Sequence, residues 1–291
     1  MSHNVSLSEY LKNNYSRATA KAYEREILIY LGNMNEAEKA MYKDIVSYFG
    51  RLRMRYTNSK TIHRIVFSIK AYYEYLISSG KRKDNPAKSI KLRDKLSNDI
   101  QLQDLFTAEE LESLLNKLER YNNLDYRNKV LMSLLIYQAL QPKELESLTI
   151  KDINLHQGTI YIKSTPTTNR RELSLKPTQI MLFYQYIFKF RSILIKNKSI
   201  ENLIVSQRGE AMNAQDISSH VKRIYGNRFP GRKVSSQTIR QSVITNLLKA
   251  GNDLRVVQTF AGHKHPSTTE KYKQNKVEEL KAGINKYHPL Q

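Results

Sequence analysis

The residues best suited to chemistry lie near the carboxyl end of the chain, in the segment AGHKHPSTTEKYKQ (residues 261–274). His263 follows a glycine, a Ser-Thr-Thr turn comes next, and Tyr272 stands nine positions after the histidine. A tyrosine oxygen can attack phosphorus and form a covalent ester that keeps the energy of the broken bond. The chain has 19 tyrosines, most of which must serve in packing, so the spacing alone distinguishes Tyr272.

Two further segments contain residues suited to binding phosphate. The stretch SSQTIRQSVITNLLKAG (residues 235–251) predicts a helix that presents Gln237 and Arg240 on one face and stops at its last glycine. A guanidinium can grip two phosphate oxygens and stays charged, although one such arginine is also explained by a surface ion pair. The stretch IYQALQPKELESLTIKDI places Gln141 and Glu144 at a helix junction. Together the three segments indicate a phosphate-handling site.

The charge of the chain indicates a polyanionic partner. The formal net charge is +21, from 48 Lys and Arg against 27 Asp and Glu. The excess is concentrated, since residues 51–100 carry 13 basic and 4 acidic side chains. Each basic group that neutralises a phosphate releases condensed counterions, so this excess favours nucleic acid over a membrane surface. A well-solvated basic surface is the plain alternative.

The composition also excludes several classes of site. The chain has no cysteine, which excludes disulfides and cysteine chemistry and fits a reducing cytoplasm. No apolar run has the length of a bilayer crossing and the first residues are polar, so neither a membrane span nor a secretion signal is expected. His263 and His265 have no third candidate ligand beside them, so no metal site is expected.

The first ninety residues predict a helical domain. Apolar residues three and four apart in four stretches of residues 1–90 indicate a small bundle of helices. The last stretch has an inward apolar stripe, made of Ile62, Ile65, Ile69 and Tyr72. The basic side chains left over on that helix, which we expect to contact DNA phosphates, are Lys60, Arg64 and Lys70. A charged stretch without periodicity, residues 91–105, predicts a linker.

Residues 106–291 predict a second domain, with helices around a small antiparallel sheet. Thr107 opens a capping box at the start of the first helix, and a long apolar helix is expected over about 125–140. Two or three short strands are expected within residues 154–175, and another at Leu203–Val205. The predicted fold class is therefore mainly α with a small antiparallel β-sheet.

At this point the chain resembles the tyrosine recombinases of the phage integrase family, of the two-domain Xer-like type. The most specific part is LLKAGNDLRVVQTFAGHKHPSTTEKY (residues 247–272), which is similar to the family pattern of helix, alanine-glycine stop, glycine-histidine turn, Ser-Thr-Thr and nucleophilic tyrosine. The resemblance covers nearly the whole length, including NPAKSI and LFTAEELESLL. It implies a SAM-like core-binding domain that clamps DNA, followed by a catalytic domain.

The resemblance also implies roles for the candidate residues. Tyr272 would attack the scissile phosphate of double-stranded DNA and form a 3′-phosphotyrosine, while Arg240 and His263 stabilise the transition state. The resemblance implies no metal or nucleotide cofactor. It implies a homo-oligomer on DNA, expected to be a tetramer, in the cytoplasm of a bacterial or archaeal cell, at the nucleoid.

The sequence departs from the family pattern at three catalytic positions. Gln141 stands where the family has the arginine of Arg-x-x-Glu, and Gln237 stands where it has the histidine of His-x-x-Arg. The register from Arg171 puts Thr165 or Pro166 where the family has a hairpin lysine, so Lys163 serves only if the hairpin is longer. The basic residues near enough in sequence to restore charge, and to contact DNA, are Lys143, Lys163, Arg170 and Arg171.

Two functions therefore stay open. The retained Arg240, His263 and Tyr272 favour an enzyme for DNA strand exchange and integration, as encoded by mobile elements. Gln141 and Gln237 favour a relative that binds DNA sites without cleaving them efficiently. In the tail, Val277, Leu280, Ile284 and Tyr287 form an apolar stripe. This stripe packs either within the chain or, as the resemblance implies, on a neighbouring protomer.

Overall fold

The chain divides into two compact units, each with a buried core of its own. The computed structural model describes residues 5–92, 105–197 and 199–272. The units are Met1–Asn98 and Asp99–Gln291. Their cores consist of separate clusters of buried apolar side chains.

Two predicted features fall largely outside these residues. Most of the predicted linker, residues 91–105, is not among them, and neither is the predicted apolar stripe of residues 277–287. No helix in the described parts of the chain is both long enough and apolar enough to cross a membrane.

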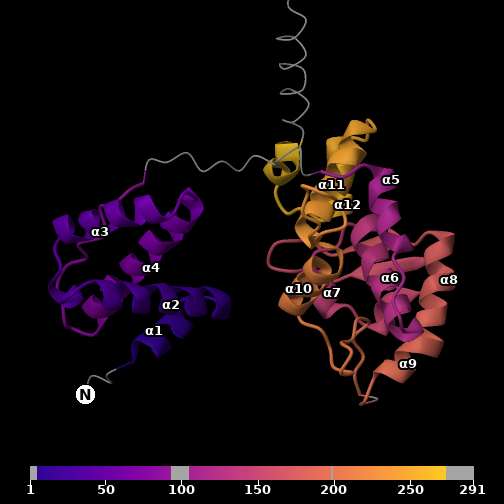
Figure 1. Ribbon diagram of the computed structural model, residues 1–291, viewed down its shortest axis with the longest axis horizontal. Helices are drawn as coiled ribbons and strands as arrows, with labels where there is room; N and C mark the ends of the chain where they lie inside the picture. Colours follow the sequence, from indigo (N-terminus) through magenta and orange to yellow (C-terminus); the bar gives the residue numbers. More distant parts are fainter. Residues whose placement is uncertain (1–4, 93–104, 198, 273–291) are drawn as a thin grey trace, which may run out of the picture. The chain divides into compact units, whose positions relative to one another are not determined.

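The first unit is a small helical bundle (Figure 1), made of α1 (Leu7–Asn14), α2 (Arg17–Asn33), α3 (Tyr42–Arg55) and α4 (Ser59–Ser78). The helices begin at polar caps: the side chains of Ser6, Ser16 and Asn58 accept hydrogen bonds from backbone N–H groups of the first turns. The third predicted helical stretch, residues 36–56, is divided. Asp44 accepts a hydrogen bond from the N–H of Met41, and α3 begins at this point.

The predicted apolar stripe of α4 is confirmed. Its four side chains are at most 4% exposed, and they pack in the core of the bundle. Buried polar groups in this core find partners, since the hydroxyls of Tyr30 and Tyr73 lie 2.7 Å apart and Tyr73 also donates to the carbonyl of Ala37.

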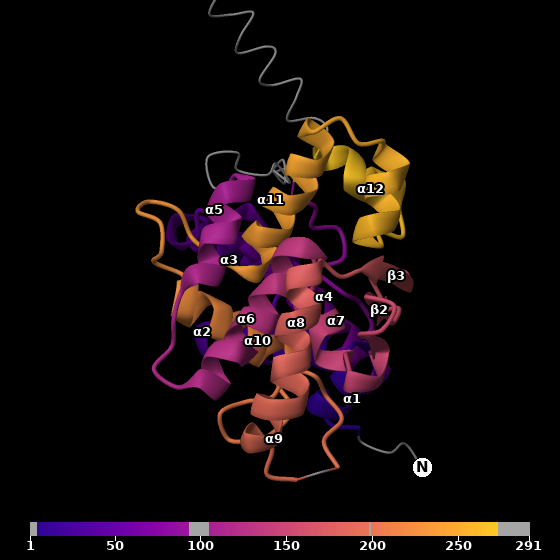
Figure 2. The same ribbon diagram turned by 90° about the vertical axis from the view of Figure 1, so that its right-hand side faces the viewer.

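The second unit is mainly helical. Its helices are α5 (Ala108–Ser113), α6 (Asn122–Tyr137), α7 (Pro142–Ser147), α8 (Pro177–Gln185), α9 (Arg191–Leu194), α10 (Ala214–Tyr225), α11 (Ser236–Lys249) and α12 (Leu254–Ala261). The predicted capping box holds, because Thr107 and Glu110 cap each other's backbone at the start of α5. The long apolar helix α6 is central, and both α8 and α11 pack against it (Figure 2).

The sheet has three short antiparallel strands in the order β1-β2-β3, which are β1 (Ile153–Asn154), β2 (Thr159–Ile162) and β3 (Arg171–Ser174). In β2 the side chains alternate, so that Ile160 and Ile162 face the core while Tyr161 is exposed. The fold class predicted from the sequence, mainly α with a small antiparallel sheet, is confirmed.

The strand predicted at Leu203–Val205 is not present. These residues are buried, but their backbone bonds go to separate segments: the N–H of Leu203 donates to Leu148, and Val205 forms a single bridge with Ala211. A short apolar run can therefore lie in the core without extending a ladder.

The connection between β2 and β3 is tied to the turn that follows α12. The N–H of Asn169 donates to the carbonyl of Gly262 at 2.8 Å, and Thr168 forms an antiparallel bridge with His263. Gly262 has φ +69°, and a Cβ there would lie 2.5 Å from Nη1 of Arg171, so only glycine fits. These contacts bring the hairpin and the histidine turn, about a hundred residues apart in sequence, to one place.

Candidate active site

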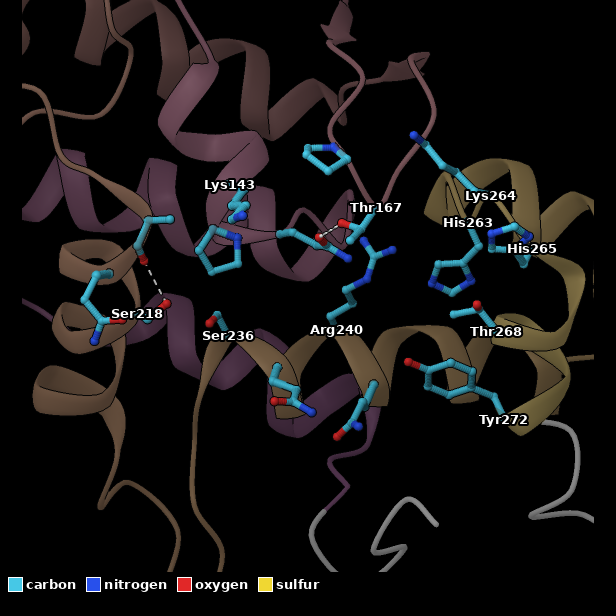
Figure 3. Close-up of a pocket in the computed structure, with 17 residues that line it drawn as sticks. Lys143, Thr167, Ser218, Ser236, Arg240, His263, Lys264, His265, Thr268 and Tyr272 are labelled. Carbon is cyan, nitrogen blue, oxygen red and sulfur yellow. Dashed lines mark hydrogen bonds between the residues drawn. The ribbon is translucent and has the colours of Figure 1, made fainter. Parts of the chain in front are cut away.

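A pocket of about 800 Å³ opens at this place in the second unit (Figure 3). Its walls come from α7, the β2–β3 connection, α10, α11 and the segment after α12. It gathers six of the residues singled out from the sequence: Gln141, Lys143, Gln237, Arg240, His263 and Tyr272. The lining contains no Asp or Glu, so an anion entering it meets no carboxylate.

Arg240 lies on α11 and its side chain is held firmly. Only 6% of the residue is exposed, and its two terminal nitrogens donate to the carbonyls of Ala139 and Ala261. Ala139 has φ +50°, a conformation that glycine adopts more readily, and its carbonyl meets the guanidinium. Burial lowers the pKa of Arg240, and the charge of Glu144 opposes that shift. The guanidinium is therefore fixed in position before any ligand arrives.

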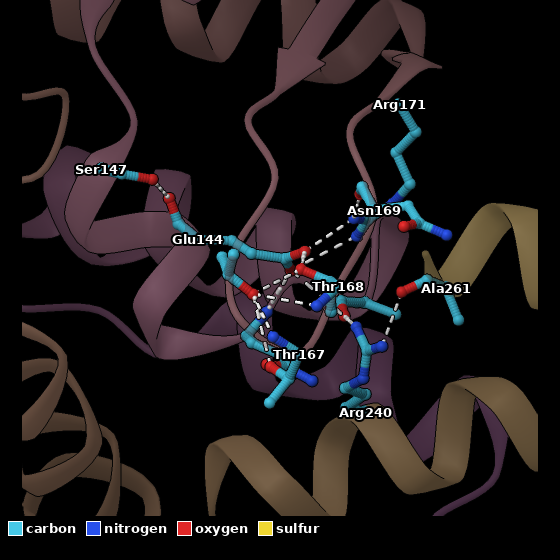
Figure 4. A network of polar contacts seen from close by, with 11 residues as sticks. Glu144, Ser147, Thr167, Thr168, Asn169, Arg171, Arg240 and Ala261 are labelled. Carbon is cyan, nitrogen blue, oxygen red and sulfur yellow. Dashed lines mark hydrogen bonds and ion pairs between the residues drawn. The ribbon is translucent and has the colours of Figure 1, made fainter. Parts of the chain in front are cut away.

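Behind Arg240 lies a buried network centred on Glu144 (Figure 4). Its carboxylate accepts hydrogen bonds from Arg171 at 2.6 Å, from the hydroxyl of Thr168 at 2.8 Å and from the N–H of Gln141 at 2.8 Å. One of its oxygens lies 3.9 Å from Nη1 of Arg240. Burial would raise the pKa of Glu144, but these partners, Arg171 first, hold it below its ordinary value. The carboxylate therefore stays charged and offsets part of the positive charge of the two buried arginines.

His263 is buried and neutral. Its Nδ1 lies 2.8 Å from the hydroxyl of Thr269, which is fully buried, and the histidine itself is 5% exposed. Burial, together with the charges of Arg240 and Arg171, lowers its pKa from 6.5 to about 4. Since Nδ1 is engaged by Thr269, the other ring nitrogen is the one left for a ligand.

Tyr272 lies beside His263 on a helical segment that begins at Pro266. The two rings are nearly parallel, with 12° between their planes and 6.1 Å between their centres. The ring also packs against the small apolar cluster of Ile244, Val257 and Ala261. Burial raises the pKa of the phenol, and Arg240 opposes that shift, so the hydroxyl is protonated at rest. Figure 3 shows this hydroxyl directed into the pocket, on the side where Arg240 and His263 lie.

The glutamines at the positions where the resemblance expects an arginine and a histidine lie at the pocket but are held less firmly. Gln141 caps α7 and its side-chain oxygen accepts a hydrogen bond from Thr167 at 3.2 Å. Gln237 is exposed on α11, one turn before Arg240. Lys143, in the first turn of α7, is also exposed.

The other basic candidates from the hairpin lie apart from the pocket lining. Lys163 pairs with Asp152 at 2.8 Å, and Arg170 is exposed. Arg171 was expected to contact DNA, but the structure places it elsewhere: its side chain is 4% exposed and is bound to Glu144. The cause is the adjoining Gly262, which leaves room for the guanidinium inside the fold. The hairpin positions that do line the pocket are Pro166 and Thr167, and neither carries a charge.

The three basic candidates of α4, in the first unit, differ in their surroundings. Lys60 is exposed. Arg64 pairs with the buried Glu26 at 2.7 Å, although 42% of its side chain is exposed. The ammonium of Lys70 donates to the carbonyl of Ile90 at 2.8 Å, and burial lowers its pKa. Lys60 is thus the most accessible of the three to a phosphate.

Sequence reasoning missed several residues that shape the site. Thr269 was read only as part of a Ser-Thr-Thr turn, yet it fixes the ring of His263. Lys264, which was not singled out, and His265, which was considered only as a metal ligand, also line the pocket and are exposed. Their position next to His263 was the available signal. Ala139 gave no signal, since nothing in its type indicates a positive φ. Among the described residues no group of three or more His, Asp or Glu is arranged to hold a metal ion.

Comparisons with known proteins identify the family of the chain. Residues 104–279, more than half of the chain, match the phage integrase family, and residues 6–80 match the phage integrase N-terminal SAM-like domain. The tyrosine recombinases XerD of Oceanobacillus iheyensis and of Staphylococcus haemolyticus are both 28% identical to the chain. The first alignment covers 96% of this chain and 95% of the relative, and the second covers 97% and 98%.

Solved structures share the fold. The Tn1549 transposon integrase in complex with transposon right end DNA has a TM-score of 0.69 and 19% identity, covering 97% of this chain and 99% of that one. The XerH site-specific recombinase bound to a palindromic difH substrate, in a post-cleavage complex, has a TM-score of 0.68 and 21% identity, covering 96% and 84%.

Proposed function

The chain belongs to the phage integrase family of tyrosine recombinases, and we propose that it cuts and rejoins double-stranded DNA at specific sites through a 3′-phosphotyrosine. The observation that carries this proposal is the meeting of Arg240, His263 and Tyr272 in one pocket without carboxylates. Relatives of the same fold have been solved with DNA bound, which supports DNA as the partner.

The chemistry follows from the groups present. A backbone phosphate enters the pocket, and Arg240, already fixed by two carbonyls, donates to its non-bridging oxygens. The oxygen of Tyr272 attacks phosphorus, the bond from phosphorus to the 5′ oxygen breaks, and the DNA 3′ end stays attached to the tyrosine. Reversal by another 5′ hydroxyl rejoins the strand. Positive charge already in place stabilises the negative charge that develops on the phosphate oxygens.

Two protons must move in the cleavage step. The phenol is protonated at rest, so its proton leaves as its oxygen attacks; His263 is neutral, lies beside it and is the acceptor that the pocket offers. The departing 5′ oxygen needs a proton in return, and the donor is a separate group. Thr269 holds the imidazole of His263 so that its free nitrogen can accept the proton of the phenol.

A second candidate function rests on three positions that are neutral where the family resemblance expects cationic or proton-transferring groups: Gln141, Gln237 and either Thr165 or Pro166. Removing one preorganised donor from a developing oxyanion costs about 10²–10³ in rate, and removing a general acid or base about 10²–10⁴. On this reading the chain binds DNA sites but cleaves them poorly. Restoring Gln141→Arg and Gln237→His should then raise the cleavage rate.

The test uses nicked suicide duplexes, in which cleavage releases a short fragment and traps the covalent complex. Because the target site is not specified by the pocket, the duplexes carry randomised sequence, and trapped DNA is sequenced. The wild-type chain should form adducts that resist denaturant. Tyr272→Phe should abolish them while DNA binding persists, and Tyr184→Phe, an exposed tyrosine of α8, should not. Wild-type binding without adducts would instead support the second function.

The cellular setting follows from the same proposal. A recombinase joins two DNA sites, so we expect several protomers, four by family resemblance, to assemble on DNA. The curated relatives are bacterial enzymes, and the corresponding place for this chain is the cytoplasm, at the nucleoid. Integration of a mobile element and resolution of chromosomes both use this chemistry.

A further inference from the structure

The proposed reaction lacks two cations at the positions where the family resemblance expects them. Gln141 supplies a hydrogen-bonding amide without charge, and neither Thr165 nor Pro166 carries a charge. Arg240 is thus the only member of the expected cationic set in the pocket lining. A proton donor for the leaving 5′ oxygen must therefore come from elsewhere in this chain.

Lys264 lies beside the hairpin in which the resemblance expects a lysine. Thr168 and His263 form an antiparallel bridge, so the residues next to them, Thr167 and Lys264, lie side by side across it. Thr165 and Pro166, the two positions at which the resemblance expects the lysine, precede Thr167 in the hairpin. Figure 3 shows Lys264 on the same side of the pocket as Thr167, extending from the histidine turn. The opposite backbone segment thus offers an ammonium where the hairpin offers none.

Lys143 lies near Gln141, the other position at which the resemblance expects a cation. It follows Gln141 by two residues, in the first turn of α7, and both line the pocket. The side chain of Gln141 is engaged by Thr167 at 3.2 Å, whereas Lys143 is exposed. An ammonium on this turn can neutralise phosphate charge as a point charge, without the two-pronged grip of arginine.

The two lysines differ from Lys163 and Arg171 in having no ion pair among the described residues. Within the described parts of the chain, neither Lys143 nor Lys264 has an ion pair, and no carboxylate lines their pocket. By contrast, Lys163 pairs with Asp152 at 2.8 Å, and Arg171 is buried against Glu144. A cation held by a carboxylate must give up that partner before it can contact a phosphate. In the part of the chain that the structure describes, Lys143 and Lys264 have no such partner to give up.

We propose that Lys264 donates the proton to the leaving 5′ oxygen and that Lys143 supplies the charge that Gln141 lacks. The proposal rests on the function proposed above. As the bond from phosphorus to the 5′ oxygen breaks, the electron pair stays on oxygen and one proton passes from the Nζ of Lys264 to it. The lysine then regains a proton when the reverse step joins a 5′ hydroxyl to the phosphotyrosine. Lys143 takes no part in proton transfer.

The experiment compares two suicide substrates that differ at one atom. One has the natural 5′ oxygen at the scissile phosphate, and the other has sulfur in that bridging position, which leaves readily without a proton. Lys264→Gln should slow adduct formation by about 10²–10⁴ on the oxygen substrate. On the sulfur substrate the rate of this variant should return to that of the wild-type chain. Lys143→Gln should slow both substrates by about 10²–10³, because it acts on the phosphate charge.

Lys151→Gln is the matched control, since it removes an exposed lysine that pairs with Glu201 and does not line the pocket. It should leave both rates unchanged. Unchanged rates for Lys264→Gln would overturn the assignment of Lys264 as the proton donor. Rescue of Lys163→Gln by the sulfur substrate, without rescue of Lys264→Gln, would overturn it as well. In either case, adducts that depend on Tyr272 would still support the proposed function. A wild-type chain that binds DNA but forms no adduct on either substrate would overturn both.

Discussion

The pocket has two kinds of wall, one buried and one exposed, and they differ in how closely they follow the family pattern. On the buried side, Arg240 and His263 are 6% and 5% exposed and keep the residue types that the resemblance expects. On the exposed side, Gln237 and the hairpin residues differ from the types that the resemblance expects, and the exposed Lys143 and Lys264 line the same pocket.

The difference teaches where substitution is costly. Changing Arg240 would leave the buried carbonyls of Ala139 and Ala261 without a donor, whereas changing an exposed side chain leaves the core unaltered. The buried residues of the site are therefore constrained by the stability of the fold. The exposed residues of the pocket can be substituted without a comparable loss of stability.

The largest expected effect comes from removing the centre of the buried wall. Glu144→Ala leaves the guanidiniums of Arg171 and Arg240 buried without their carboxylate, which should destabilise the second unit by about 3–5 kcal/mol. Hydrogen exchange of the amides in α7 and α11 measures this change.

Glu146→Ala is the matched control, because it removes an exposed carboxylate from the same short helix. The two variants should differ strongly. Equal protection of the amides in both would show that the buried network does not hold the wall together.

An intermediate effect should follow from pH. The pKa of His220 and of His263 is about 4 in the folded chain, below the ordinary 6.5, because both rings are buried among cations. The unfolded chain then binds more protons below pH 6.5, so stability present above that value is lost as the pH falls toward 4. Each histidine contributes at most about 1.4 kcal/mol per pH unit in that window.

Urea unfolding followed by circular dichroism between pH 7 and pH 4 measures this loss. His220→Asn should flatten the dependence, and His156→Asn, which removes an exposed histidine, should leave it unchanged. A wild-type chain equally stable at pH 6.5 and pH 4.5 would show that these rings are not buried neutral.

The smallest expected effect concerns the positioning of His263 by Thr269. Thr269→Val removes the hydroxyl 2.8 Å from Nδ1 and keeps the shape, so a hydrogen bond worth about 1–2 kcal/mol is lost and adduct formation should slow by about tenfold. Thr269→Ser retains the hydroxyl and should restore the rate. If valine and serine behave alike, the hydroxyl has only a packing role.

The sequence predicted the residues of the site better than their surroundings. Periodicity and capping identified α4, α5 and α6, and the resemblance, together with the segment 235–251, singled out Arg240, His263 and Tyr272. These signals are local, because helix faces and turns repeat over a few residues.

Features that depend on distant contacts were not predictable in this way. Burial of Arg171 depends on Gly262, which lies 91 positions away, and the register of Lys264 depends on a bridge to Thr168. The strand expected at residues 203–205 failed for the same reason, since a ladder needs a partner that an apolar run does not reveal.

The most direct test of the central claim is to locate the covalent bond to DNA. The trapped wild-type complex is digested with protease and nuclease, and the peptide that carries the nucleotide is identified by mass spectrometry. The account predicts a nucleotide 3′-phosphate on Tyr272. A nucleotide on any other side chain, or tightly bound DNA with no modified peptide, would contradict it.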